Sequence, residues 1–122
     1  MRKEDRLNYE VVKYFRERAL GFIFHIPNEG VRSARQAASL IAQGLTAGVP
    51  DFFVALKNGR SFFVELKTEK GRLSKRQKVV VKQLNECNQR VYLCRTIQEF
   101  QAGIRERAGW CQRASGYLFQ NN

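Results

Sequence analysis

Residues 51–67 constrain the fold of this chain more than any other stretch. Two apolar runs, 51–56 and 61–66, are rich in Phe and Val and flank an Asn-Gly pair. Aromatic and β-branched residues on both sides of Asn-Gly indicate a β-hairpin. Because nearly every residue of both runs is apolar, we expect two strands that are covered on both faces.

The register of this hairpin decides whether its carboxylates meet. Side chains alternate along a strand, so Glu65 and Lys67 lie on one face. A two-residue turn would place Asp51 on the opposite face, whereas a three-residue loop of residues 57–59 pairs Asp51 with Glu65. We predict the three-residue loop, because Gly59 tolerates the left-handed conformation of a bulge position.

The paired carboxylates predict a cation site. Two carboxylates on one face repel each other unless a positive charge lies between them, and oxygen ligands favour a divalent cation. Lys67, further along the same face, can neutralise a phosphate oxygen or orient a water. A hairpin with solvated end charges explains the same residues, and the hairpin alone does not separate the two interpretations.

Further motifs along the chain distinguish between these two interpretations of the hairpin. Pro50-Asp51, followed after the hairpin by Glu65-Leu66-Lys67, resembles the short PD-(D/E)XK nuclease signature. Over roughly residues 8–104 the chain resembles the VRR-NUC branch of that superfamily. The further pieces, in family order, are the helix of Glu10, His25-Ile26-Pro27-Asn28-Glu29-Gly30 with Arg32 and Arg35, Gly44 through Gly48-Val49-Pro50-Asp51, and Leu73-Ser74-Lys75-Arg76-Gln77.

The resemblance implies a metal-dependent endodeoxyribonuclease that hydrolyses phosphodiester bonds, with Mg²⁺ as cofactor and Mn²⁺ as a substitute. The implied metal ligands are Glu10, Asp51, Glu65 and the carbonyl of Leu66, and the implied catalytic residues are Asp51, Glu65, Lys67 and Gln77. From the residues alone, Glu10 is better explained as a solvated side chain or as a partner of Lys13 or Arg6, and only the resemblance assigns it to the metal.

The same resemblance implies branched DNA, such as a four-way junction, as the substrate and a homodimer as the working form. Two alternatives from other classes stay open. One is a non-catalytic nucleic-acid-binding domain with the same fold. The other is a small subunit of a larger DNA-processing complex, docked through the aromatic residues between 110 and 119.

The remaining segments predict an α/β sandwich similar to the restriction-endonuclease-like fold, with a mixed central sheet of about four strands and flanking helices. Strand 90–95 follows a helix and should pair in parallel with strand 61–66. The other predicted elements are helix 5–19, strand 21–26, helix 33–43, helix 74–88 and helix 97–107.

Two polar side chains, one glycine and one helix face carry specific expectations. Gln77 is the capping partner of Ser74, a group that orients water or phosphate, or both. His25, at a strand end, is expected to be structural. Gly48 leaves room for close approach by a phosphate or by another chain segment. On helix 74–88, the residues expected to point inward are Val79, Val80, Leu84 and Cys87.

The charge distribution indicates a polyanionic partner. The net charge of the 122 residues is +11, and residues 57–95 hold 11 basic and 3 acidic side chains beside the proposed site. Such a cluster favours nucleic acid. The length fits one domain, 1–122, with a core over about 5–107 and an aromatic-bearing tail at 109–122.

The cysteines and the hydropathy indicate the cellular compartment. The 3 cysteines show no C-x-x-C spacing, and with no signal peptide they indicate a reducing cytosol. No apolar run approaches the ~18–20 residues that span a bilayer. We therefore expect a cytoplasmic protein with no membrane partner.

Overall fold

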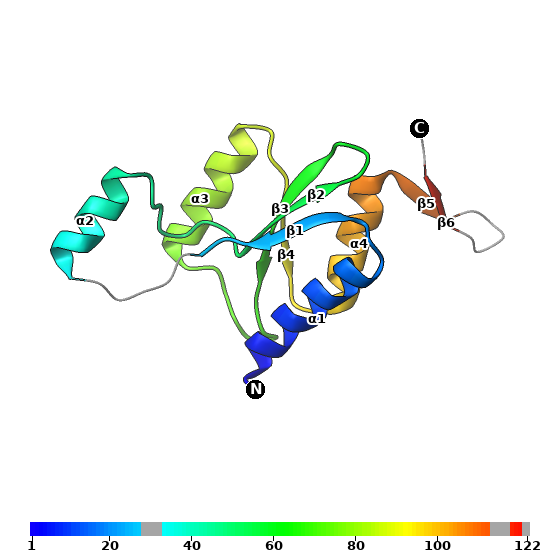
Figure 1. The fold of residues 1–122 in the computed structure, drawn as a ribbon, viewed down its shortest axis with the longest axis horizontal. Coiled ribbons are helices and arrows are strands. Elements are labelled where there is room, and N and C mark those ends of the chain that lie inside the picture. Colours follow the sequence, from blue (N-terminus) through cyan, green and yellow to red (C-terminus); the bar gives the residue numbers. More distant parts are fainter. Residues whose placement is uncertain (28–32, 113–117, 121–122) are drawn as a thin grey trace.

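A four-stranded mixed sheet forms the centre of the molecule (Figure 1). The computed structural model describes residues 1–27, 33–112 and 118–120. The strands lie in the order β1-β2-β3-β4, with β1, β2 and β3 antiparallel and β4 parallel to β3. Their bounds are β1 Gly21–His25, β2 Phe52–Leu56, β3 Ser61–Leu66 and β4 Val91–Cys94. The predicted α/β class and the parallel last strand are both confirmed.

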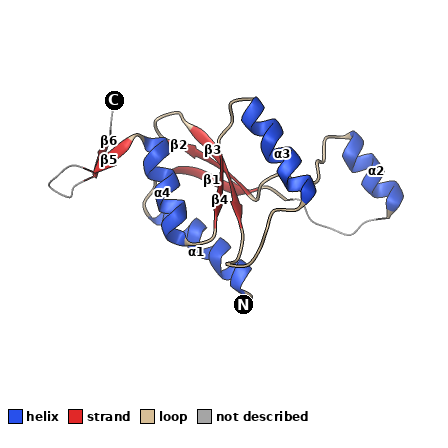
Figure 2. Cartoon of the chain, turned by 180° about the vertical axis from the view of Figure 1, so that it is seen from behind, coloured by secondary structure: helices blue, strands red, loops and turns tan. Residues whose placement is uncertain are grey.

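Four helices flank the sheet or extend from it. Their bounds are α1 Lys3–Glu17, α2 Ala34–Ala42, α3 Lys75–Glu86 and α4 Ile97–Ala108. Helices α1 and α4 lie on one face, and α3 lies on the other (Figures 1 and 2). None of the helices in the described part of the chain has the length and hydropathy to cross a membrane.

The hairpin has the predicted register. Phe52 pairs with Val64 and Ala55 with Ser61, which aligns position 51 with position 65. The loop is closed by a hydrogen bond from the Leu56 N–H to the Arg60 carbonyl at 2.8 Å. Gly59 has φ +90°, the left-handed conformation that a bulge residue requires. The three-residue loop therefore delivers Asp51 and Glu65 to one end and one face of the sheet.

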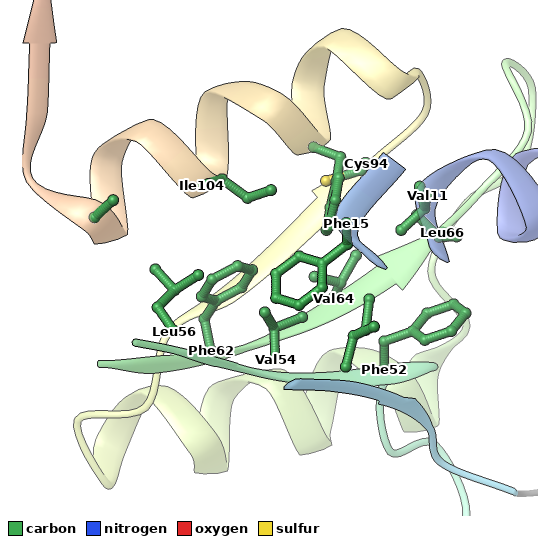
Figure 3. Packing of buried hydrophobic residues seen from close by; sticks show 13 residues of the cluster. Val11, Phe15, Phe52, Val54, Leu56, Phe62, Val64, Leu66, Cys94 and Ile104 are labelled. Carbon is green, nitrogen blue, oxygen red and sulfur yellow. The ribbon is translucent and has the colours of Figure 1, made fainter. Parts of the chain in front are cut away.

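One apolar core joins the sheet to α1 and α4 (Figure 3). Val11 and Phe15 of α1 are fully buried, and Phe100 and Ile104 of α4 are 1% exposed. The Phe15 and Phe100 rings pack with centroids 6.4 Å apart. Burying side chains of this size stabilises the fold by about 1.5–3 kcal/mol each, so this interface holds the two helices against the sheet.

The opposite face is covered only in part. Helix α3 buries Val80 and half-buries Leu84, but Val79 is 45% exposed and Cys87 is exposed, so the inward placement predicted for the last two is wrong. Phe53 and Phe63 are only half-buried. The expectation that both hairpin strands are covered on both faces therefore holds for one face alone.

The tail forms a small hairpin that the sequence did not predict. Strands β5 Trp110–Gln112 and β6 Leu118–Gln120 pair antiparallel in a separate two-stranded sheet. Helix α4 ends before it at Gly109, whose φ of +72° is the left-handed conformation typical of a helix C-terminus. The side chains of the tail, on which the docking alternative depends, lie outside the described residues.

Candidate active site

Asp51 and Glu65 meet at the end of the hairpin. The N–H of Leu66 donates a hydrogen bond of 2.8 Å to Oδ2 of Asp51, which fixes that carboxylate against β3. Glu65 is 4% exposed and is the one charged residue buried among the described residues. Because a buried carboxylate destabilises the fold unless it is paired or bound to a cation, this carboxylate pair indicates a functional site.

Gln77 ties α3 to this pair. Its Nε2 donates to Oε1 of Glu65 at 2.9 Å, while its Oε1 accepts from the N–H of Ser74 at 2.8 Å. The hydroxyl of Ser74 accepts in return from the N–H of Gln77 at 3.1 Å, completing a capping box. The capping role predicted for Gln77 is confirmed, and the helix cap fixes the orientation of the amide toward Glu65.

Lys67 provides the positive charge. Its Nζ lies 3.6 Å from Oε1 of Glu65, and its side chain is 19% exposed. The ammonium is thus close to the buried carboxylate and still open to a ligand on its other side. This is the arrangement predicted for a group that neutralises a phosphate oxygen.

Burial and the neighbouring Asp51 carboxylate both favour the protonated form of Glu65. Burial, and after it the Asp51 carboxylate, raises the pKa of Glu65 to about 7, although Lys67 lowers it. Burial also raises the pKa of Asp51 above its ordinary value, against the lowering effect of the Leu66 N–H. Without further positive charge, the pair thus retains a proton near neutral pH.

An acid of α1 other than the predicted Glu10 acts electrostatically on this pair, namely Glu4. The Glu4 carboxylate raises the pKa of Asp51, as the smallest of several contributions. Glu10 is exposed. Within the described residues, no three His, Cys, Asp or Glu side chains are grouped so that they could hold a metal ion, so the side chains as placed do not join Glu10 to Asp51 and Glu65.

A periodicity signal could have found Glu4. It lies seven residues before the fully buried Val11, so the two side chains share one face of α1. The expected helix began at residue 5, which left Glu4 outside it, whereas α1 begins at Lys3. Helix boundaries are the least reliable part of a pattern-based prediction.

Two arginines fix the segments that carry the site. The guanidinium Nη1 of Arg95 donates to the carbonyls of Thr68, Glu69 and Gly71 in the loop after Lys67. Arg76 Nε donates to the carbonyl of Ala47 at 3.1 Å, four residues before Asp51. These hydrogen bonds hold the segment before Asp51 against α3, and the loop after Lys67 against the end of β4.

Gly48 allows the close approach of α3 that the hydrogen bond from Arg76 to Ala47 requires. A Cβ at Gly48 would lie 3.0 Å from the carbonyl carbon and oxygen of Arg76, and its φ is +86°. Another chain segment, not a phosphate, therefore fills the space beside Gly48. The other glycine of that loop, Gly44, has no such neighbour.

His25 packs at the end of β1 against the neighbouring strand β2. The His25 ring packs edge-on against Phe52 with centroids 5.2 Å apart, in agreement with a structural role, and its charge lowers the pKa of Asp51. Asn28, Glu29, Gly30 and Arg32 lie outside the described residues.

A family comparison decides the classification. The model of the VRR-NUC domain matches residues 3–98, which include Glu4, Asp51, Glu65, Lys67 and Gln77. The chain belongs to the VRR-NUC family. VRR-NUC domains are nuclease-type domains, so the match also gives the general class of activity.

A solved structure agrees with this classification. A protein named "VRR_NUC domain protein" superposes on this chain with a TM-score of 0.67 and 19% identity, over 88% of each chain. At that identity the likeness shows the VRR-NUC fold and no more. No curated protein matches the sequence.

Proposed function

We propose that this VRR-NUC protein is a metal-dependent endodeoxyribonuclease that hydrolyses phosphodiester bonds in branched DNA. The observation that carries the proposal is the pairing of the Asp51 and Glu65 carboxylates beside the Lys67 ammonium. A non-catalytic binder would have no need of a carboxylate pair in which burial and the neighbouring charge raise the pKa of Glu65. The intact set therefore favours catalysis over binding alone.

The donor atoms fit a hard divalent cation. Asp51 and Glu65 supply carboxylate oxygens, the donors that Mg²⁺ and Mn²⁺ prefer. A cation would offset both the burial of Glu65 and its repulsion by Asp51, the two effects that raise the pKa of Glu65. We expect Asp51, Glu65 and the Leu66 carbonyl to hold Mg²⁺, with Glu4 in place of Glu10 as the acid from α1. When bound, the cation supplies a coordinated water of lowered pKa that can attack phosphorus.

The residues of the chain perform the remaining tasks. Lys67 neutralises charge that develops on the phosphate oxygens as phosphorus is attacked. The Gln77 amide holds Glu65 in place through its hydrogen bond of 2.9 Å. Four exposed cations on α3 face solvent beside the site and are suited to phosphates of the DNA backbone, namely Lys75, Arg76, Lys78 and Lys82.

A cleavage panel tests this function. The purified protein should cut a labelled four-way junction faster than linear, nicked or flap DNA of the same sequence, because one small domain has no separate module for reading sequence. Cutting should require Mg²⁺ or Mn²⁺ and stop in EDTA. Cleavage that persists after exhaustive chelation would contradict the proposal, and equal rates on all four DNAs would remove the branched-DNA preference.

A further inference from the structure

A polar cavity lies at the C-terminal end of α3, the end away from the candidate site. The side chains that line it can all donate hydrogen bonds, and they belong to Asn85, Asn88, Gln89, Arg90 and Arg107. None of these residues is an acid, and two are cations. Carboxamides and guanidinium groups gathered in one place suit an anion with several oxygens, such as a phosphate group. We refer to this space as the terminal cavity.

Arg107 brings an unpaired donor to the terminal cavity. Its Nε is buried and has no hydrogen-bond partner among the described residues. Buried N–H groups in folded proteins are nearly always paired, so one that is not indicates a binding partner from outside the chain. The unpaired Nε is therefore evidence for a ligand that is independent of the charge of the cavity.

The guanidinium group of Arg107 is held in place before any ligand binds. Its Nη2 donates to the carbonyl of Ser61 at 3.1 Å, at the start of β3. The carbonyl of Arg107 accepts from Nδ2 of Asn58 at 3.2 Å and from Nη1 of Arg60 at 3.3 Å. Because both ends of the residue are fixed, little conformational entropy is lost when an anion binds.

A groove beside α3 leads from the loop after Lys67 to the terminal cavity. Its lining consists of Leu73, Lys78, Val81, Lys82, Asn85 and Glu86. Leu73 lies in the loop that follows Lys67, and Asn85 also lines the terminal cavity. The groove therefore begins near the candidate site and continues into the cavity.

Cations follow the same path along α3. The side chains of Lys75, Lys78, Lys82 and Asn85 recur at intervals of three or four residues, so they form one stripe of the helix. All of them are exposed. We refer to these residues as the α3 stripe, which presents three ammonium groups between the site and the terminal cavity.

We propose that the terminal cavity binds a backbone phosphate of the same DNA arm whose scissile phosphate lies at Asp51 and Glu65, with the α3 stripe following the phosphates between them. This inference rests on the proposed nuclease function and adds the path of the substrate. Helix α3 extends about 12 Å from Gln77 to Asn85, and β3 extends about 13 Å from Ser61 to Glu65. Since phosphates of one strand advance about 3.4 Å per nucleotide, the two contacts lie about four nucleotides apart.

The electrostatics favour a DNA backbone over a free anion in the terminal cavity. The last turns of α3 and α4 both contribute to its lining, and helix C-termini carry partial negative charge. Glu106 also pairs with Arg90 at 3.0 Å, and Glu86 lines the neighbouring groove. A small anion would thus be held weakly, whereas a polyanion is bound by the α3 stripe at the same time.

Fluorescence anisotropy with a labelled four-way junction in EDTA tests the contact without cleavage. Arg107→Gln should weaken binding by about tenfold and reduce the salt dependence by about one phosphate contact. Asn88→Gly should weaken binding by about threefold. Asn88 has φ +61°, which glycine adopts freely, so this variant removes the amide without strain and provides the test even where Arg107→Gln disturbs the packing at Ser61. The matched control is Arg16→Gln, which removes an exposed cation of α1 on the opposite face of the sheet and should bind like the parent.

A methylphosphonate scan of the cleaved strand places the contact. Each substitution neutralises one phosphate, and cleavage by the parent in Mg²⁺ should slow most when the neutral phosphate lies about four nucleotides from the cut. Arg107→Gln should be insensitive to that same substitution, because the two changes remove the same interaction.

Parent affinity in both cavity variants, an equal loss in Arg16→Gln, or a scan with no sensitive position in a protein that cleaves would overturn the proposal. So would an Arg107 effect that disappears in inorganic phosphate but not in chloride of the same ionic strength, because that result assigns the cavity to a free anion. A protein that cleaves no DNA, yet loses affinity in both cavity variants alone, would refute the proposed nuclease function and support the phosphate contact.

Discussion

Replacing Glu65 by glutamine should lower the rate of Mg²⁺-dependent cleavage by at least about 100- to 1000-fold. The substitution removes one negative charge from the carboxylate pair. It retains an oxygen that can accept the hydrogen bond from Gln77 Nε2, now 2.9 Å long, so the packing around position 65 is preserved. Single-turnover cleavage of a labelled junction measures the effect. We expect losses of similar size for Asp51→Asn and Lys67→Met.

A matched control separates chemistry from binding. Glu69→Gln removes the same charge from an exposed side chain four residues further on and should cleave at the parent rate. Glu65→Gln, Asp51→Asn and Glu69→Gln should bind DNA with the salt dependence of the parent, since none of them removes a cation. A Glu65→Gln protein that cuts within tenfold of the parent would contradict the assigned role of the carboxylate.

The second large effect is a pH dependence of stability in the absence of metal. The pKa of Glu65 is about 7 in the folded protein, against an ordinary value of 4.5. Between these values the folded state binds more protons than the unfolded state, so the free energy of unfolding falls as pH rises. The loss should reach about 3 kcal/mol between pH 4.5 and 7 and should not grow above pH 7.

Urea unfolding in EDTA at pH 5 and pH 8 measures this loss, and Glu65→Gln isolates it from other titrating groups. The variant should lack most of the loss and should be more stable than the parent at pH 8. The raised pKa of Asp51 acts in the same direction, so some dependence remains. Parent and variant curves that run parallel over this range would show that Glu65 titrates normally.

Added Mg²⁺ should reverse the trend. A cation that binds the deprotonated pair stabilises the folded state more at pH 8 than at pH 5, because protons compete for the same oxygens. The same urea series with Mg²⁺ provides this comparison. The Glu65→Gln variant serves as its control, because it should gain little from the cation at either pH.

The central hairpin could be predicted from the sequence because local rules act together there. Strand alternation, an Asn-Gly pair and one glycine in a left-handed conformation leave few registers, and only one of them brings Asp51 and Glu65 together. The capping role of Gln77 and its position beside the site could be predicted for a similar reason. Its helix begins close to the end of β3, and the capping box fixes its side chain.

Features that depend on long-range packing could not be predicted. The loop after Lys67 is held by Arg95, 24 to 27 residues away, and no local pattern pairs them. Apolar periodicity placed Val79 and Cys87 inward, yet hydrophobicity does not reveal how far a neighbouring helix extends over a sheet. The same limit hid the exposure of Phe22 and Phe24, since the composition of a strand does not show whether its second face is covered.

A crystal of the protein grown with Mn²⁺ tests the central claim most directly, because anomalous scattering locates the ion. We predict a peak within about 2.0–2.4 Å of carboxylate oxygens of both Asp51 and Glu65, with Glu4 nearer to it than Glu10. A crystal soaked in saturating Mn²⁺ that shows no anomalous peak there, with both carboxylates hydrogen-bonded only to protein or water, would contradict the claim.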